Sequence, residues 1–159
     1  MLRMSKLADY ATVVMTLMAQ VPEQVRNAPE IAAAVGLELP TVSKILKSLV
    51  RTGLLLSQRG PKGGYKLARQ PEAIPIADII DAIEGYPMGL TECSSIIGLC
   101  SRESSCAVRT NWQRISREIR LSLERITLAE LAQPQATQPA VHVDIENRST
   151  NMKQREASM

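Results

Sequence analysis

Three cysteines and a single histidine are the residues of this sequence best suited to chemistry. Cys93, Cys100 and Cys106 fall within fourteen residues, with gaps of six and five residues between them. The only histidine, His142, is far away along the chain. A histidine-based catalytic triad or a multi-histidine zinc site is therefore nearly excluded, and we expect the protein not to be an enzyme.

The cysteine spacing leaves several chemistries open. Structural zinc sites favour ligand pairs roughly two to four residues apart and need four ligands, so the spacing fits zinc poorly. Clustered thiolates favour an iron–sulfur centre, and a loop with Gly89, Gly98 and several serines can donate backbone N–H groups to its sulfides. Three unrelated free thiols, or a redox switch that forms one disulfide, are the alternatives. An odd number of cysteines argues against a disulfide framework.

Periodic apolar residues predict the elements that position this loop. Residues that recur every three or four positions indicate six helical segments, namely 6–20, 29–36, 40–52, 75–84, 106–126 and a last turn that a capping box opens at Thr127. Two strand candidates, 54–58 and 65–69, flank the turn-rich segment 59–64 and indicate a β-hairpin. The fold class that follows is mainly α, with one small hairpin and a long C-terminal helix.

Positive charge is concentrated in the first part of the chain. The formal net charge of the 159 residues is +3, but it is +6 for residues 1–70, −5 for 71–107, +2 for 108–133 and 0 for 134–159. A local excess of positive charge is expected of a nucleic-acid-binding module, with a solvated basic surface as the alternative. We therefore divide the chain into a DNA-binding domain (1–70), a cysteine loop with a dimerisation helix (71–133) and a disordered tail (134–159).

The helix pair and the hairpin predict a winged helix-turn-helix. Gly36 permits the tight turn between the second and third helices, and the hairpin that follows would form the wing. The third helix is expected to enter the DNA major groove. Its base-edge candidates are Thr41, Ser43 and Lys44, and its phosphate-contact candidates are Lys47, Ser48 and Arg51. Arg59 and Lys62 at the hairpin tip are expected in the minor groove. A plain scaffold or a protein-binding winged helix is the alternative.

The sequence resembles the iron–sulfur-sensing winged-helix transcriptional regulators of the IscR and NsrR type over about residues 1–133. The motifs that carry the resemblance are Met-Ser-Lys-Leu-Ala-Asp-Tyr-Ala (4–11), Arg-Gly-Pro-Lys-Gly-Gly-Tyr (59–65), the three-cysteine loop, Trp112 and Ile-Thr-Leu-Ala-Glu-Leu (126–131). Within that family, the chain is most similar to the branch that controls Suf-type iron–sulfur assembly operons. The resemblance implies a homodimer built on the long helix, a double-stranded DNA operator, and a cluster held by Cys93, Cys100 and Cys106.

The resemblance does not identify the fourth ligand of the cluster. The IscR pattern places a ligating histidine three residues beyond the third cysteine, where this chain has Arg109, which cannot ligate. The NsrR pattern uses an aspartate from the first helix of the other subunit, and Asp9 occupies the matching place. Asp9 could equally serve only as an acid at the positive end of a helix. Glu92, Glu103 or a small exogenous thiol are further candidates. We favour a 2Fe–2S cluster, with 4Fe–4S as the alternative.

The function expected from these observations is a cluster-binding repressor of Suf- or Isc-type iron–sulfur assembly genes. A family member that responds to nitric oxide or to cysteine supply is one alternative. A cluster carrier or interaction module that does not bind DNA is another. No apolar run reaches the roughly 18 residues that a membrane span needs, so we expect a cytoplasmic protein.

Overall fold

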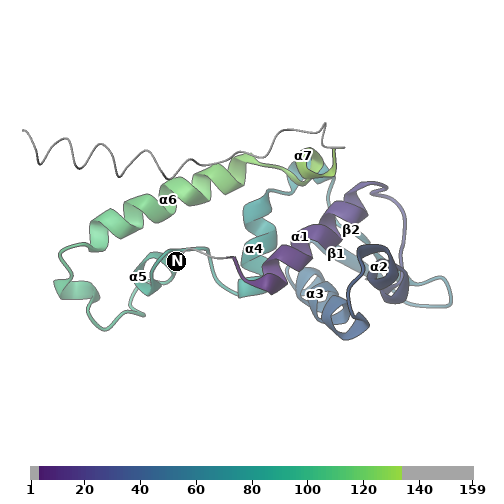
Figure 1. Ribbon diagram of the computed structural model, residues 1–159, viewed down its shortest axis with the longest axis horizontal. Helices are drawn as coiled ribbons and strands as arrows, with labels where there is room; N and C mark the ends of the chain where they lie inside the picture. Colours follow the sequence, from purple (N-terminus) through teal and green to yellow (C-terminus); the bar gives the residue numbers. More distant parts are fainter. Residues whose placement is uncertain (1–3, 134–159) are drawn as a thin grey trace, which may run out of the picture.

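The computed structural model describes residues 4–133, and the predicted tail with His142 lies outside them. The helices and strands follow in the order α1 (Lys6–Ala19), α2 (Ala28–Val35), α3 (Leu39–Arg51), β1 (Leu55–Gln58), β2 (Gly64–Leu67), α4 (Ile76–Glu84), α5 (Glu92–Ser95), α6 (Arg109–Arg125) and α7 (Leu128–Ala132). Two short 3₁₀ helices, η1 (Pro71–Ala73) and η2 (Glu103–Ser105), complete the set. The mainly helical class with one antiparallel hairpin is confirmed (Figure 1).

Polar side chains fix where several helices begin. The Ser5 side chain accepts a hydrogen bond from the N–H of Ala8 at 3.1 Å and caps α1, as the sequence predicts. Asn27 caps α2 through a capping box with Glu30, so this helix begins one residue before the predicted Pro29. The predicted capping box at Thr127 is present at the start of α7. These caps satisfy N–H groups that the helix itself leaves without partners.

One hydrophobic core joins the first four helices, the hairpin and α7. Val14 and Met15 of α1 are fully buried, and α1 contacts α2, α3, α4 and α7. The predicted inner face of α3 is also buried, and it consists of Val42, Ile45, Leu46 and Leu49. Ile79 and Leu128, from beyond residue 70, belong to the same core. The boundary at residue 70 stays a prediction, and it does not separate two hydrophobic cores.

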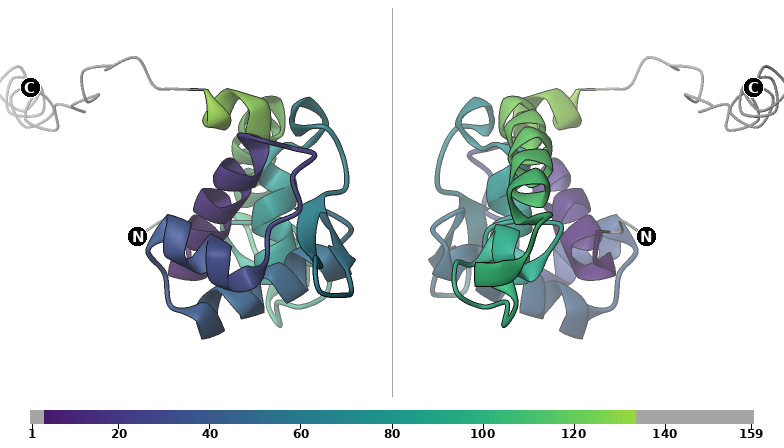
Figure 2. Two further views of the ribbon diagram at one scale, coloured as in Figure 1. Left: turned by 90° about the vertical axis from the view of Figure 1, so that its right-hand side faces the viewer. Right: turned by 90° about the vertical axis from the view of Figure 1, so that its left-hand side faces the viewer.

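The C-terminal end of α6 is fastened to this core. The N–H of Ile76 donates to the carbonyl of Ile126 at 3.0 Å, and the N–H of Leu128 donates to the carbonyl of Ile74 at 2.8 Å. From this anchor, α6 passes α4, which it contacts, and extends to the cysteine loop (Figure 2). Figure 1 shows the cysteine loop and the wing at opposite ends of the long axis.

Candidate nucleic-acid interface and cysteine loop

The outer face of α3 is polar, basic and accessible. Lys44, Lys47 and Arg51 are exposed, whereas Thr41, Ser43 and Ser48 are half-buried. The buried aliphatic face holds the helix in place, so the opposite face projects from the molecule. This arrangement matches what a helix in the major groove requires, with short polar side chains near its beginning and cations along its length.

The cations of α3 and of the wing are unpaired within the described part of the chain. Four ion pairs occur among residues 4–133, and none of them involves the five predicted DNA-contacting cations, which are Lys44, Lys47, Arg51, Arg59 and Lys62. A cation that has no carboxylate partner can meet a phosphate without first giving up another ion pair. The five side chains are thus suited to a polyanionic partner.

The wing is a hairpin of two four-residue strands that is anchored to the segment preceding α2. Leu55 pairs with Leu67 and Gln58 with Gly64 across the two strands. Tyr65 and Arg26 exchange backbone hydrogen bonds of 2.8 and 3.0 Å. A Cβ at position 64 would collide with the carbonyl group of Arg26, so glycine is needed for this close approach. The anchor fixes the direction in which the tip with Arg59 and Lys62 projects.

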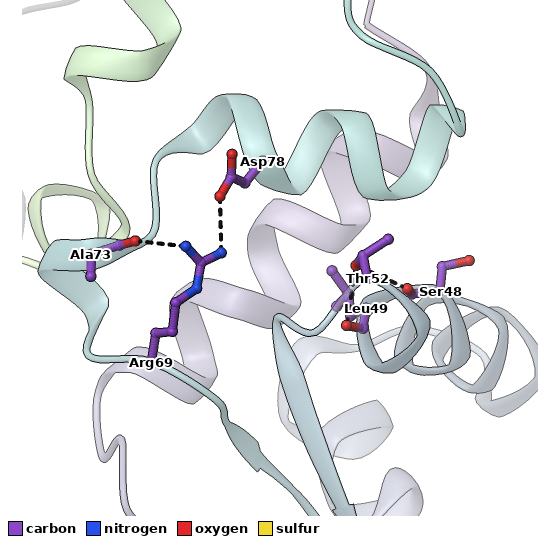
Figure 3. A network of polar contacts seen from close by, with 6 residues as sticks. All are labelled: Ser48, Leu49, Thr52, Arg69, Ala73 and Asp78. Atoms are coloured by element: carbon purple, nitrogen blue, oxygen red, sulfur yellow. Dashed lines mark hydrogen bonds and ion pairs between the residues drawn. The ribbon is translucent and has the colours of Figure 1, made fainter.

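Arg69 differs from the five predicted DNA-contacting cations because its side chain makes contacts within the chain that stabilise the fold. Its guanidinium donates to the carbonyl of Ala73 at 3.2 Å and to the carboxylate of Asp78 in α4 at 2.9 Å (Figure 3). In the same view, the Thr52 hydroxyl donates to the carbonyls of Ser48 and Leu49 and closes the end of α3. The contact through Arg69 ties the chain after β2 to the beginning of α4.

The three cysteines lie in one segment, but they are not gathered around one point. Cys93, in α5, is buried, and Cys100 and Cys106 are half-buried. All three are free thiols. Within residues 4–133, no three cysteine, histidine, aspartate or glutamate side chains are close enough to hold a metal ion. The exposed Asp9 lies on α1, outside this loop. Ligation by these cysteines therefore requires the loop to rearrange.

Glu103 and Arg109 form an ion pair inside the loop. Glu103 is only 9% exposed, and its Oε2 accepts a hydrogen bond from the N–H of Gly98 at 2.6 Å. The Nη2 atom of Arg109 lies 2.6 Å from Oε1 of Glu103. The sequence indicates Glu103 as a possible cluster ligand and excludes Arg109 as one, but it contains no signal that the two side chains pair.

Hydrogen bonds connect the loop to α6, and an ion pair connects α6 to α4. The Gln113 side chain donates to the carbonyl of Cys93 at 3.1 Å, and the N–H of Leu90 donates to the hydroxyl of the buried Ser116 at 3.0 Å. Arg120 pairs with Asp81 at 2.8 Å. Burial alone would lower the pKa of Arg120, but hydrogen bonds and charge from Asp81, and then from Glu124, outweigh it and raise the pKa. Gln113 and Ser116 could not be identified from the sequence, because a polar residue on a helix is ordinarily expected to face solvent.

The other face of α6 carries exposed apolar side chains. Trp112 is 40% and Ile115 is 41% exposed. Ser116 is the only residue of this helix that is buried in the single chain. A groove of about 720 Å³ runs between the beginning of α1, α4 and α6, and Met4, Trp112 and Leu123 help to line it. An apolar helix face of this kind is typical of a protein–protein interface.

Comparison with known proteins places these features in context. Residues 4–134 match the family model of Rrf2, an iron-dependent transcriptional regulator. The chain is 29% identical over 129 residues to the protein rrf2 of Nitratidesulfovibrio vulgaris, covering 81% of this chain and 85% of that protein. It is 33% identical over 106 residues to the HTH-type transcriptional regulator IscR of Yersinia pseudotuberculosis. That match covers 67% of this chain and 63%, less than two thirds, of IscR.

Solved structures show the same fold. CymR (YrzC), the global cysteine regulator of B. subtilis, is 29% identical with a TM-score of 0.65, and the match covers 83% of this chain and 97% of CymR. IscR of T. potens is 28% identical with a TM-score of 0.62, covering 82% and 85% of the two chains. These relatives are regulators and not enzymes, as expected for this chain. Among residues 4–133, no helix is long and apolar enough to cross a membrane.

Proposed function

Because the chain belongs to the Rrf2 family of transcriptional regulators, we propose that it is a homodimeric, cluster-sensing repressor of Suf- or Isc-type iron–sulfur assembly genes. The observation that carries the DNA-binding part is the basic surface of α3 and the wing, whose cations have no carboxylate partner within residues 4–133. Two copies of α3 would meet half-sites about one helical turn, or roughly 34 Å, apart. In each half-site, Thr41, Ser43 and Lys44 would meet base edges, and Lys47, Ser48 and Arg51 would meet phosphates.

The dimer would be built on α6. Its exposed face offers Trp112 and Ile115, which a second copy would cover. The partner's α6 is the occupant that the proposal requires, since a closed two-fold dimer uses the same face twice. A dimer would also set the spacing between the two copies of α3.

Cys93, Cys100 and Cys106 would hold the cluster, with 2Fe–2S as the favoured type. Three free thiols within one Gly- and Ser-containing loop support this assignment, because thiolates are the usual ligands of iron–sulfur centres. Loop residues with exposed apolar side chains also support rearrangement on ligation, the most exposed being Ile97 at 83%. When bound, the cluster would supply a group whose presence or absence selects between two conformations of this loop. Asp9 of the partner subunit is one proposed source of the fourth ligand.

A continuous set of contacts can carry the state of the loop to α3. Gln113 and Ser116 hold the loop on α6, and Arg120 holds α6 on Asp81 of α4. Helix α4 contacts α3, and Arg69 ties it to the chain that follows the wing. A coupling free energy of about 1–3 kcal/mol between the two sites would change operator affinity roughly 5–150-fold.

A regulator of cysteine metabolism is the second candidate, and the likeness to CymR favours it. Anaerobic purification separates the two. A coloured protein whose visible band is lost in a Cys93/Cys100/Cys106→Ala triple variant is the expected result. A colourless protein with three free thiols under strict anaerobiosis would contradict cluster binding and leave the CymR-like function.

The DNA-binding part has a separate test. In a gel-shift assay, Lys44→Ala and Arg59→Ala should each weaken operator binding, and added salt should weaken the wild type steeply. Operator affinity that does not change with salt would contradict DNA binding through this surface.

A further inference from the structure

Leu39 is an aliphatic residue of α3 that the fold leaves uncovered. It is the first residue of the helix, and it is 43% exposed. The other aliphatic residues of α3 are buried in the hydrophobic core or packed against it, namely Val42, Ile45, Leu46, Leu49 and Val50. Leu39 belongs to neither group. The hydrophobic core of the described residues thus gives no reason for a large aliphatic side chain at this position.

The residues next to Leu39 are also open to solvent. Glu38 and Pro40 are both exposed, and Glu38 at the N-cap makes no side-chain hydrogen bond to α3. The helix therefore begins with two adjacent apolar residues, Leu39 and Pro40, in contact with water. Removing apolar surface from water is favourable, so a partner that offers an apolar group to this pair would be bound more tightly.

Helix geometry places the pair on the proposed DNA-facing surface. Residues four positions apart are neighbours on one face of a helix, about 5–6 Å from each other. Ser43 is therefore the neighbour of Leu39 one turn further along, and Lys44 is the neighbour of Pro40. Ser43 and Lys44 are proposed to meet base edges, and the N-terminal residues of a recognition helix are the ones that reach the bases. Leu39 and Pro40 extend the base-reading face to the beginning of α3.

The major groove offers an apolar group of its own to such a side chain. Among the four bases, thymine presents a C5-methyl group there, whereas the other groups that distinguish the bases are hydrogen-bond donors and acceptors. We propose that Leu39 recognises the C5-methyl group of a thymine in each half-site, with Pro40 beside it. The proposal rests on the DNA-binding function proposed above and deepens it, because it assigns a preference for thymine to a residue that makes no hydrogen bond to a base.

The test uses the full-length protein and an operator that the wild type selects from a pool of random-sequence duplexes. Each thymine is replaced in turn by deoxyuridine, at the matching positions of both half-sites. This change removes the methyl group and keeps the hydrogen-bonding groups of the base pair. At one position, we expect the wild type to lose affinity about fourfold per half-site and about fifteenfold for both, as for one buried CH₂-sized group in each.

Two variants connect this loss to Leu39. Leu39→Ala should bind the unmodified operator more weakly than the wild type does, and deoxyuridine at the same position should weaken its binding by less than about twofold, because effects of groups in contact are not additive. Val13→Ala is the matched control, since Val13 is 44% exposed but lies on α1. It should respond to deoxyuridine as the wild type does. Thermal unfolding checks that each variant keeps the fold.

Three results would overturn the proposal. Wild-type affinity that deoxyuridine changes at no position would show that no thymine methyl group is read. Equal losses in the wild type and in Leu39→Ala would show that another residue reads it. A Leu39→Ala variant that binds DNA as the wild type does, but forms weaker dimers in sedimentation velocity, would assign Leu39 to a contact between copies of the chain.

Failure of the proposed function would look different. A wild type that selects no duplex from the pool would refute DNA binding itself. A wild type that selects an operator and binds it tightly, but without any dependence on the methyl groups, would leave DNA binding in place and refute only the role of Leu39.

Discussion

Replacement of one unpaired cation should change the salt dependence of operator binding by an amount that the structure predicts. Lys47 is exposed on α3 and has no carboxylate partner within residues 4–133, so we expect it to contact a phosphate. A phosphate contact adds about 0.9 to the slope of log affinity against log salt. Lys47→Ala removes one contact from each protomer, so a dimer should lose about 1.8 from this slope.

This change in slope is large enough to measure. Between about 50 and 200 mM salt, a slope that is lower by about 1.8 means that the variant loses roughly twelvefold less affinity than the wild type. The assay is a fluorescence-anisotropy titration of a labelled operator at several salt concentrations. Arg69→Ala is the matched control, because it also removes a cation near the wing, but this cation already pairs with Asp78.

The control should leave the slope unchanged even if it lowers the melting temperature. An unchanged slope in Lys47→Ala would refute the assignment of α3 as the DNA-facing helix. An equal change of slope in both variants would refute the reasoning that ion pairing within the chain distinguishes structural cations from DNA-contacting ones.

Three other substitutions test the fold and the assembly. Leu128→Ala should lower the free energy of unfolding by about 2–5 kcal/mol in a urea titration, because Leu128 is fully buried; a loss no larger than that of Leu131→Ala, which is half-buried, would contradict its role as an anchor. Gly64→Ala should lower operator affinity and the melting temperature, because the added Cβ collides with the backbone of Arg26; wild-type values for both would show that the wing needs no such contact. Trp112→Ala should weaken dimerisation in sedimentation velocity at decreasing protein concentration, and an unchanged dimer would exclude this face of α6.

Much of the fold could be predicted because its signals are local. The buried face of α3 follows from apolar residues three and four positions apart, and the bounds of α3 differ from the prediction by one residue at each end. The beginning of α6 was predicted less well. Cys106 has extended backbone dihedrals, so the helix begins at Arg109 and not at Cys106. Periodicity does not mark that end, because the apolar pattern continues into the loop.

The candidate site could be predicted only as a set of residue types. Clustered cysteines and a segregated positive charge are visible in the chain itself. Whether a given cation is available depends on its partner, and Arg69 and Asp78 are nine positions apart. Arg69 lies in the basic segment 1–70, but its side chain pairs with Asp78 and joins the chain after β2 to α4.

The amino-acid sequence alone is enough to predict the order of the α-helices other than α5, which the periodicity did not indicate, together with the hairpin, the polar face of α3 and the confinement of all three cysteines to one segment. Each of these depends on residues that are close together along the chain, where periodicity, capping and turn preferences act. Three features are visible only in the folded protein: Glu103 is buried against Arg109, α6 is joined to α4 by the ion pair of Arg120 with Asp81, and within residues 4–133 the three thiols do not form a metal-binding group. Burial and ion pairing depend on what the folded chain brings together, and the Arg120–Asp81 contact joins residues 39 positions apart.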